Sequence, residues 1–391
     1  MLSSPASYLG TKLLELWGWL GLVGRNTWNP HVKTARQHFR IRYLGIHLSS
    51  TLYMPPLRLA SHFSIRNPPR LLPKSMKMTA QQTKIPTRIM IISDTHSFQF
   101  DNSDIPLSLS KIPSDIDVLL HCGDLTRVGG LPEYRGALQM LHAIPAKLKL
   151  VIAGNHDRTL DKAWVLRNLG REPTDEEAEE DLRECAEGNA IMRGGLAGEA
   201  GVTYLEEGVH DCRLENGAAL RVYASPYTPE FCGFGWAYGR DEDRFNGAAE
   251  RGVGMTGVEG AVRVPSFGEA DDGRNIDIVM THGPPHNVLD KVAGHGGHVG
   301  CCSLLKALGR ARPALFCCGH IHEGHGAEVA RWGEGGIVES RTVECRWPEL
   351  NSEGIDEGME TLMVNASIMD LRYRALQKPW YIELGLPKAT N

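Results

Sequence analysis

Five short polar motifs in this sequence place aspartate, asparagine and histidine at spacings that suit metal binding. They are Asp94-Thr95-His96, Gly123-Asp124, Gly154-Asn155-His156-Asp157, Thr281-His282-Gly283 and Gly319-His320-Ile321-His322. In an extended segment, side chains alternate between two sides, so Asp94 and His96 would share a side and could chelate one ion together. His320 and His322 would do the same. A single motif of this kind is more often turn chemistry or a buried histidine, but five in one chain argue against chance.

Two sets of four protein ligands can be drawn from these motifs if Asp124 is shared. One set comprises Asp94, His96, Asp124 and His322. The other set comprises Asp124, Asn155, His282 and His320. Mixed oxygen and nitrogen ligands without thiolate suit manganese, iron or zinc better than calcium, and they argue against an iron-sulfur cluster. We therefore expect two divalent metal ions, with manganese first among the candidates and iron or zinc as alternatives.

Each motif directly follows a short apolar run with the length and composition of a buried strand. The five runs cover residues 88–93, 117–122, 148–153, 276–281 and 314–318. Helical spacing occurs between them in residues 132–141 and in residues 301–308, where Gly309 is the expected C-terminal cap. Strands that alternate with helices indicate an α/β domain, in which ligands bind at the carboxyl edge of the strands. The motifs should therefore converge on one cleft, and their glycines should permit close approach of the backbone.

Two segments look inserted into this α/β pattern. Residues 176–187 (EEAEEDLRECAE) are rich in acids, which predicts a solvated surface helix. Residues 239–275 are rich in glycine and charged residues and have little periodicity, which predicts a long loop.

The charge of this 391-residue chain is unevenly distributed. Residues 1–93 hold 13 Lys and Arg but a single acid, Glu15, whereas the rest holds 29 Lys and Arg and 46 Asp and Glu. The acidic main part has no broad field that favours nucleic-acid phosphates, so bulk nucleic-acid binding is not expected. We divide the chain into a basic N-terminal extension, residues 1–85, and an α/β domain, residues 86–391.

The basic extension allows more than one interpretation. Its apolar run, residues 16–23, is far shorter than the roughly 20 residues that span a bilayer, so no transmembrane segment is expected. A disordered extension, or a true start at Met76 or Met78, is favoured over an organelle transit peptide, although the Arg, Ser and His content fits the latter. Nine cysteines without spaced CxxC doublets indicate a reduced, intracellular chain. We expect a cytoplasmic protein, with the mitochondrion as the alternative.

The motifs also carry a family resemblance. DTH, GDLT, GNHD, THGPP and GHIH, in this order, resemble the five signature blocks of the calcineurin-like metallophosphoesterases and span roughly residues 88–325. The segments SPYTPEFCGFGWAY, THGPPHNVLDK and GHIHEGHG, with NAS at residues 365–367, resemble the metallophosphoesterase-domain-containing (MPPED) branch. Asp157 stands where that branch often carries glutamate.

The resemblance implies a fold, a site and a reaction. The implied fold is a four-layer α/β/β/α metallophosphoesterase sandwich, with two mixed β-sheets flanked by helices. The implied metal ligands are Asp94, His96, Asp124, Asn155, His282, His320 and His322. His156 matches a catalytic histidine that is not a ligand. It would protonate the leaving alkoxide after a hydroxide held between the metals attacks phosphorus, a role worth about 10²- to 10⁴-fold.

Several function classes follow from this reading. The leading one is a metal-dependent phosphodiesterase that acts on a small, cyclic nucleotide-like substrate, an activity implied by the branch resemblance alone. A phosphomonoesterase or a Ser/Thr protein phosphatase is the enzymatic alternative. A scaffold that binds metal or nucleotide with little turnover is the non-enzymatic alternative. No organic cofactor is expected, and the sequence indicates no oligomeric state.

Other polar and aromatic residues have weaker interpretations. Arg127 would either grip a substrate phosphate or form a surface ion pair. His121 and His325 could orient metal ligands from the second layer of side chains. Trp236 and Tyr238 could stack on a nucleobase, but packing is the favoured interpretation.

Overall fold

The computed structural model describes residues 84–101, 105–169, 175–270, 272–294 and 296–390. The predicted basic extension, residues 1–85, therefore lies almost wholly outside the described residues, and the domain division stays a prediction. Among the described residues, no helix is both long and apolar enough to cross a membrane. All nine cysteines are free thiols, and none forms a disulfide.

The first sheet carries three of the five predicted strands. Its order is β16 (Trp380–Leu386), β1 (Ile85–Ile92), β2 (Ile116–His121), β3 (Ala146–Val151) and β4 (Val202–Tyr204). Strands β1 to β4 run parallel, and β16 pairs antiparallel with β1. The sheet is therefore mixed, with the carboxyl ends of β1, β2 and β3 at one edge.

The second sheet carries the other two predicted strands. Its order is β14 (Gly336–Val343), β13 (Gly326–Gly333), β15 (Glu360–Asn365), β12 (Leu315–Cys318), β11 (Ile278–Thr281), β6 (Ala219–Ser225) and β5 (Gly208–Arg213). The four strands β15, β12, β11 and β6 are parallel, and the outer strands are antiparallel. This sheet is also mixed, so both sheets agree with the expected sandwich.

The two sheets pack face to face, and alternation along each strand assigns side chains to different layers. Ile89 and Ile91 of β1 join the core between the sheets, together with Val222 of β6 and Met280 of β11. Met90, the intervening residue, faces the helices on the outer side of the first sheet. Burial on both faces explains why these strands are continuous apolar runs.

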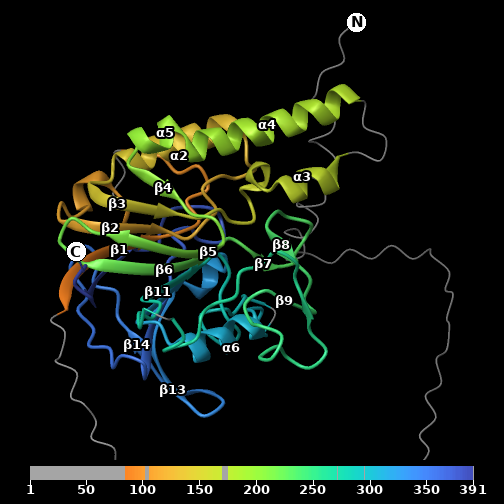
Figure 1. Cartoon of the computed structure of the whole chain (residues 1–391). Helices are drawn as coiled ribbons and strands as arrows, with labels where there is room; N and C mark the ends of the chain where they lie inside the picture. The colour runs from red at the N-terminus through yellow and green to blue at the C-terminus, as the bar shows by residue number, and fades with distance from the viewer. Residues whose placement is uncertain (1–83, 102–104, 170–174, 271, 295, 391) are drawn as a thin grey trace, which may run out of the picture. The chain divides into compact units, whose positions relative to one another are not determined.

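Helices cover the outer face of each sheet (Figure 1). On the first sheet lie α2 (Leu131–His142), α4 (Asp175–Arg193) and α5 (Gly195–Glu199), and the short α3 (Lys162–Asn168) packs beside α4. On the second sheet lies α6 (Cys302–Ala311), whose buried face includes Leu304 and Leu308. The expected four-layer α/β/β/α sandwich is confirmed.

The helix predictions are confirmed with one correction. α2 and α6 cover the two apolar repeats, and α4 extends the acid-rich stretch to Arg193. Gly309 was the predicted C-terminal cap of α6, but it lies inside that helix and packs against Trp332. Arg312, in the left-handed region with φ 47°, ends the helix instead. A small residue near the end of a helix can thus serve packing rather than capping.

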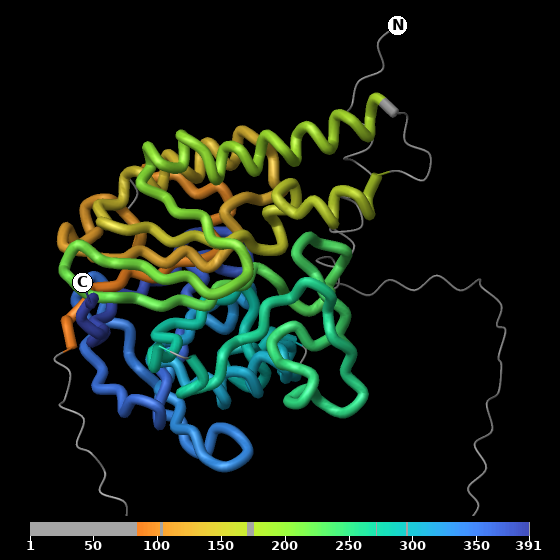
Figure 2. The backbone as a smooth tube through the Cα atoms, viewed as in Figure 1, coloured from red at the N-terminus to blue at the C-terminus, as the bar shows by residue number. Residues whose placement is uncertain are grey.

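The predicted long loop at residues 239–275 has little regular structure, as expected (Figure 2). The described part of the loop contains two short strands, β9 (Glu242–Asp243) and β10 (Thr256–Gly257). Two more, β7 (Thr228–Pro229) and β8 (Ala237–Tyr238), lie in the segment before the loop. It is nevertheless packed, because Phe245 and Val264 are fully buried against the α6 side of the second sheet. Three short 3₁₀ turns, η1 (Leu109–Lys111), η2 (Arg158–Leu160) and η3 (His322–Gly324), complete the described elements.

Candidate metal centre

The five polar motifs meet where the carboxyl edges of the two sheets come together. The first sheet supplies Asp94, His96, Asp124 and Asn155 from the ends of β1, β2 and β3. The second sheet supplies His282, His320 and His322 from the ends of β11 and β12. All seven predicted ligands are brought together by the contacts described below. The site thus joins two sheets, rather than lying on the edge of one.

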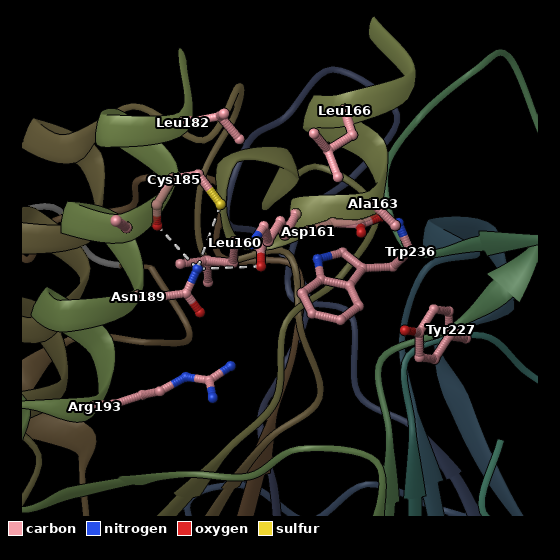
Figure 3. Close-up of a pocket in the computed structure, with 12 residues that line it drawn as sticks. Leu160, Asp161, Ala163, Leu166, Leu182, Cys185, Asn189, Arg193, Tyr227 and Trp236 are labelled. Carbon is pink, nitrogen blue, oxygen red and sulfur yellow. Dashed lines mark hydrogen bonds between the residues drawn. The ribbon is translucent and has the colours of Figure 1, made fainter. Parts of the chain in front are cut away.

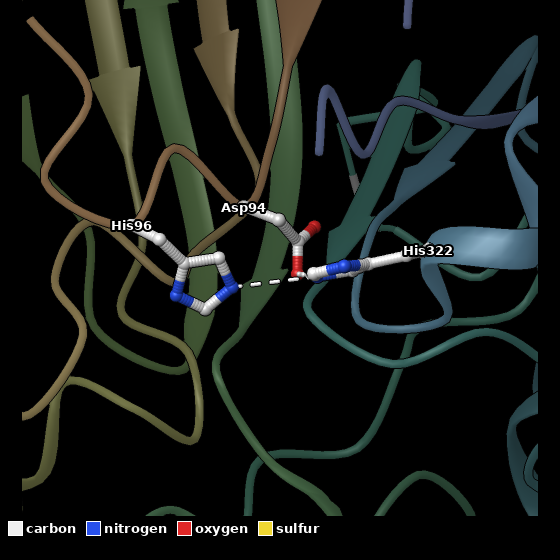
Figure 4. A group of neighbouring side chains, drawn as sticks. All are labelled: Asp94, His96 and His322. Carbon is white, nitrogen blue, oxygen red and sulfur yellow. Dashed lines mark hydrogen bonds and ion pairs between the residues drawn. The ribbon is translucent and has the colours of Figure 1, made fainter. Parts of the chain in front are cut away.

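The first group of side chains converges around His96. His96 Nε2 lies 3.3 Å from His322 Nε2, and His322 Nε2 lies 3.3 Å from Asp94 Oδ1. Asp124 Oδ2 lies 3.6 Å from His96 Nε2. Figure 4 shows Asp94, His96 and His322 pointing toward one another from two separate segments. These four residues are the first of the two sets expected from the sequence.

The second group shares Asp124 with the first. Asp124 Oδ1, the oxygen that does not face His96, lies 3.3 Å from His282 Nε2. Asn155 Oδ1 lies 2.9 Å from His282 Nε2 and 2.8 Å from His320 Nδ1. These residues are the second expected set. Each carboxylate oxygen of Asp124 therefore faces a different group, as a shared ligand requires.

Backbone carbonyls fix the tautomer of three of the histidines. His96, His282 and His322 direct Nδ1 at the carbonyl oxygens of Thr126, Cys122 and Asp370, at 3.0, 2.8 and 3.3 Å, respectively. A carbonyl oxygen only accepts hydrogen bonds, so Nδ1 carries the proton. Nε2 then has a free lone pair whenever the ring is neutral. The converging atoms are therefore the ones that are able to bind a cation, an arrangement common among metal-ligating histidines.

The backbone at the site corrects the reason given for the pairing of ligands. Asp94 and His96 are not extended, since their φ angles are 55° and 42°. Asp124 and His320 also have positive φ, at 54° and 68°. Left-handed non-glycine residues are uncommon and concentrate at functional sites. Tight turns, rather than strand alternation, thus bring each pair to a common point.

Glycines of the motifs make room for these turns, as predicted. A Cβ on Gly123, whose φ is 98°, would lie 2.6 Å from the Ala153 carbonyl oxygen and 2.7 Å from His282 Nδ1. A Cβ on Gly319 would overlap the Asp94 carboxylate. Both positions require glycine, because atoms of a candidate ligand already fill the space that a Cβ would occupy.

Burial and neighbouring charges together set the protonation of the centre. It lowers the pKa of His96 to about 4 and that of His320 to about 3, so both rings are neutral at physiological pH. Burial also opposes charge on His282, but the adjacent Asp124 carboxylate prevails and raises the pKa of His282 to about 9. Asp124 itself is 2% exposed, and its pKa is lowered because the neighbouring histidines outweigh burial.

His156 lies at the border of both groups. Its backbone N–H donates to Asp124 Oδ1 at 2.8 Å, and its Nδ1 donates to the Arg127 carbonyl at 2.7 Å. Its ring centroid is 4.8 Å from that of His96 and 4.5 Å from that of Phe234. Nδ1–H is committed to a carbonyl, so Nε2 is the nitrogen that can exchange a proton with a ligand.

Asp157 supports the loops rather than the His156 imidazole. Its carboxylate accepts the backbone N–H groups of Leu125, Thr126 and Gly154 at 3.1, 2.9 and 2.9 Å. It also accepts the Thr126 hydroxyl at 2.7 Å. Asp157 thus ties the Asp124 loop to the Asn155 loop, and the Arg127 carbonyl orients the imidazole instead.

The weaker interpretations of the sequence have mixed outcomes. His121 is buried, receives the Gly123 N–H at 3.3 Å and contacts the Thr95 hydroxyl at 2.9 Å, so it supports the loops that carry the ligands. His325 instead contacts the Lys378 carbonyl. Trp236 and Tyr238 are buried core residues, as favoured. Within the described residues, Arg127 forms no ion pair, and its Nε donates to the His96 carbonyl.

Four residues at the site were missed by the sequence reasoning. The Ser367 hydroxyl donates to Asp94 Oδ2 at 2.8 Å, and Asp370 holds His322 through its carbonyl. Tyr373 and Phe234 place aromatic rings within 5 Å of His96 and His156, respectively. Ser367 and Phe234 fall in segments that carry the family resemblance. Asp370 and Tyr373 come from an irregular segment before β16 and have no sequence signal of their own.

Another histidine-aspartate cluster lies in the loop after β11. Asp290 is fully buried and pairs with His298, while His286 Nδ1 lies 3.9 Å away. Asp290 Oδ2 also accepts the N–H groups of Asn287 and Gly300 at 3.1 and 2.9 Å. This cluster closes the loop on itself. His295, in the same loop, is outside the described residues.

A cavity of about 730 Å³ lies away from the metal centre, between α3, α4 and Trp236 (Figure 3). Its walls are mostly apolar, and none of the seven candidate ligands lines it. Trp236 lines this cavity, and its indole N–H donates to the carbonyl of Asp157 at 3.1 Å. The candidate site is therefore defined by its ligands and not by this cavity.

Comparison with known proteins identifies relatives of the chain. The family model described as calcineurin-like phosphoesterase matches residues 87–324. The human protein named metallophosphoesterase domain-containing protein 1 is 27% identical over 307 residues, 77% of this chain and 72% of that protein. A probable rhamnogalacturonate lyase C of Emericella nidulans is 30% identical over 247 residues, 63% of this chain and 18% of that protein. A probable cyclic nucleotide phosphodiesterase of Vesicomyosocius okutanii is 48% identical over 56 residues, 13% of this chain and 24% of that protein.

The matched span contains all seven candidate ligands and His156. The resemblance carried by the five motifs is thereby confirmed, including the metallophosphoesterase-domain-containing branch. The fold and the convergent donor atoms agree with it. The chain belongs to the calcineurin-like phosphoesterase family, hydrolases that act on phosphoester bonds and bind divalent metal ions.

Proposed function

We propose that this protein is a phosphodiesterase that uses two divalent metal ions, preferentially Mn²⁺, on a small cyclic nucleotide-like ester. One ion would be held by Asp94, His96, Asp124 and His322. The other would be held by Asp124, Asn155, His282 and His320. The single observation that carries the proposal is the division of Asp124, whose two carboxylate oxygens face two separate groups of donor atoms.

The donor atoms suit cations in a further respect. Two Nε2 atoms, of His96 and His322, face each other at 3.3 Å while both Nδ1–H groups are committed to backbone carbonyls. When both rings are neutral, two lone pairs face each other at that distance and repel unless a cation lies between them. The nitrogen and oxygen donors, with no thiolate among them, fit Mn²⁺, Fe or Zn²⁺. When bound, two such ions supply an activated water and offset charge on the phosphoryl oxygens.

Two side chains of the protein would then act on the leaving group and on the phosphate. His156 is fixed by the Arg127 carbonyl at Nδ1, so its Nε2 is the position from which a proton can be delivered. A cationic His156 would protonate the departing alkoxide, as a general acid does. Arg127, tethered to the His96 carbonyl, would offer its guanidinium to a phosphate oxygen.

The choice of a diester over a monoester rests on the branch resemblance and on one relative. The relative named probable cyclic nucleotide phosphodiesterase shares 48% identity over a short span of 56 residues. That name belongs to the other protein, and the proposal extends it to this chain. Phosphomonoesters and phosphopeptides are the substrates of the competing functions.

The test uses the full chain, stripped with chelator and reloaded with Mn²⁺. Bis(p-nitrophenyl) phosphate, p-nitrophenyl phosphate and a phosphoserine peptide are compared as substrates. Diester cleavage that requires Mn²⁺ and exceeds monoester cleavage supports the proposal. Preference for the monoester or the peptide would replace it with a phosphatase, and two bound ions without turnover would replace it with a binding protein.

A further inference from the structure

The mouth of the metal centre is bordered by two aromatic side chains that the reaction described above does not use. Tyr373 is 45% exposed, and its ring centroid lies 4.8 Å from that of His96 and 5.5 Å from that of His322. Phe234 is half-buried and lies 4.5 Å from His156. Tyr373 is also 6.5 Å from His156, so both rings neighbour the same imidazole.

Tyr373 is held in place by a turn that is tied to a candidate ligand. Tyr373 N–H donates to the Asp370 carbonyl at 2.9 Å, and the same carbonyl receives His322 Nδ1–H. The Asp370 carboxylate accepts the Arg374 N–H at 2.9 Å and pairs with its guanidinium at 2.6 Å. Gln377 Nε2 donates to the His322 carbonyl at 2.8 Å. The ring therefore has a fixed position relative to the ligands.

Phe234 is positioned in a comparable way. Gly235 N–H donates to the carbonyl of Asn155, a candidate ligand, at 3.1 Å. Trp164 Nε1 donates to the Gly233 carbonyl at 2.8 Å on the other side of Phe234. Cys232 and Trp236, which flank it, have positive φ angles of 54° and 53°, and Tyr373 has 55°. Both rings thus occur on strained turns that are anchored to the metal centre.

The exposure of these rings is costly unless a ligand covers them. Leu371 and Leu376, close to Tyr373 in the sequence, and Phe231, close to Phe234, are also exposed, so both rings belong to segments that present apolar surface. Exposed apolar surface around a polar centre marks a binding site for a partly apolar ligand. Aromatic rings in particular stack on flat heterocycles, with little dependence on which base is bound.

We propose that Tyr373 and Phe234 form two aromatic walls that bind the flat ring of a nucleoside phosphate while its phosphate occupies the metal centre. This inference rests on the proposed function and adds the residues that contact the base. Contact between the base and the two rings would give the site its preference for esters that carry a base. An ester of a simple alkyl alcohol or of a bare sugar would lack that contact.

The test measures binding of AMP and of ribose 5-phosphate to the Mn²⁺-loaded full chain by titration calorimetry. The two probes share the sugar and the phosphate, so the ratio of their Kd values reports the base alone. We expect AMP to bind about 10-fold more tightly. Tyr373→Ala and Phe234→Ala should each lower that ratio several-fold and leave the Kd of ribose 5-phosphate within about 2-fold.

Two further variants sharpen the assignment. Tyr373→Phe keeps the ring and should keep the ratio, which separates stacking from a hydrogen bond of the hydroxyl. Leu196→Ala removes a side chain of similar exposure, 43%, from α5 on the outer face of the first sheet and should leave the ratio unchanged. A ratio near one in the unmodified protein, or no binding of AMP, overturns the inference, and a ratio unaffected by either alanine variant removes that residue from the walls. Turnover is not needed for this measurement, so failure of the proposed hydrolysis is scored separately.

Discussion

The described domain contains two clusters of histidine and aspartate with similar composition and different chemistry. In the cluster around Asp124, the Nδ1–H groups of His96 and His282 bond to backbone carbonyls, and their Nε2 atoms face inward. In the cluster around Asp290, histidine Nδ1 faces the carboxylate itself, and backbone N–H groups complete it. In the first cluster, the inward-facing histidine nitrogens are left for another partner, whereas in the second a carboxylate already occupies the histidine nitrogen. Residue types alone therefore do not define a metal site; the partners of each nitrogen do.

The largest effect is expected when the first cluster is broken at its shared residue. Asp124→Asn keeps an acceptor for the His156 N–H and tolerates the left-handed backbone, but it removes the charge that faces both groups. Loss of a hydrogen-bond partner behind a metal ligand already costs about 10- to 100-fold in metal affinity or activity. Asp124 would contact both ions directly, so kcat/KM should fall on the order of 10⁴-fold. Metal content, measured by mass spectrometry, should fall below two per chain. Two bound ions with normal turnover would remove Asp124 from the centre.

A smaller effect is expected when the metals are kept and the proton donor is removed. His156→Ala should lower kcat by about 10³-fold for a substrate with an alkoxide leaving group. The loss should shrink for a p-nitrophenyl ester, because that leaving group departs without a proton. Kinetics on both substrates, with metal content as the control, check this dependence. An equal loss on both would assign His156 a role other than general acid.

A still smaller effect is expected from a residue that supports a ligand from outside. Ser367→Ala removes the hydroxyl that donates to Asp94 Oδ2 and should weaken Mn²⁺ binding about 10-fold. Ser225→Ala is a matched control, since that buried hydroxyl donates to Glu207 instead. Calorimetric titration of both variants compares their Mn²⁺ affinities. Equal affinities would make Ser367 a packing residue.

Breaking the second cluster should leave the chemistry nearly unchanged. Asp290→Asn removes the charge that pairs with His298 and weakens the bonds from Asn287 and Gly300, so it should cost about 2 kcal/mol of stability. Metal content and kcat/KM should stay within about 2-fold, as they should in Asp241→Asn, an exposed control that should also keep its stability. Chemical denaturation and activity assays separate the two effects. Loss of metal in Asp290→Asn would mean that the clusters are coupled.

The strands of the fold were predictable because they are buried on both faces. The runs that became β1, β2, β3, β11 and β12 carry apolar residues at most positions, facing one layer or the other. Their exact arrangement into two sheets was not, because pairing is a long-range property. β16 lies beside β1 although about 300 residues of chain separate paired positions such as Ile85 and Leu386. The cap of α6 was misjudged because Gly309 is selected by contact with Trp332 rather than by the helix end.

The candidate ligands were also predictable, although the reason given for their pairing was wrong. Asp94 and His96 share a target because both residues lie in left-handed turns, which the sequence does not reveal. Tyr373 was not foreseen, since its role depends on a turn that reaches His322 from a distant segment.

By itself, the sequence determined which donor atoms are available, in what order, and at the ends of which strands. Only the tertiary structure decided that Asp124 presents one oxygen to each group, that backbone carbonyls hold the histidine protons, and that Tyr373 and Phe234 border the mouth. The physical reason is that residue type sets chemical capacity locally. Protonation, orientation and exposure, in contrast, depend on neighbours brought together from the whole chain.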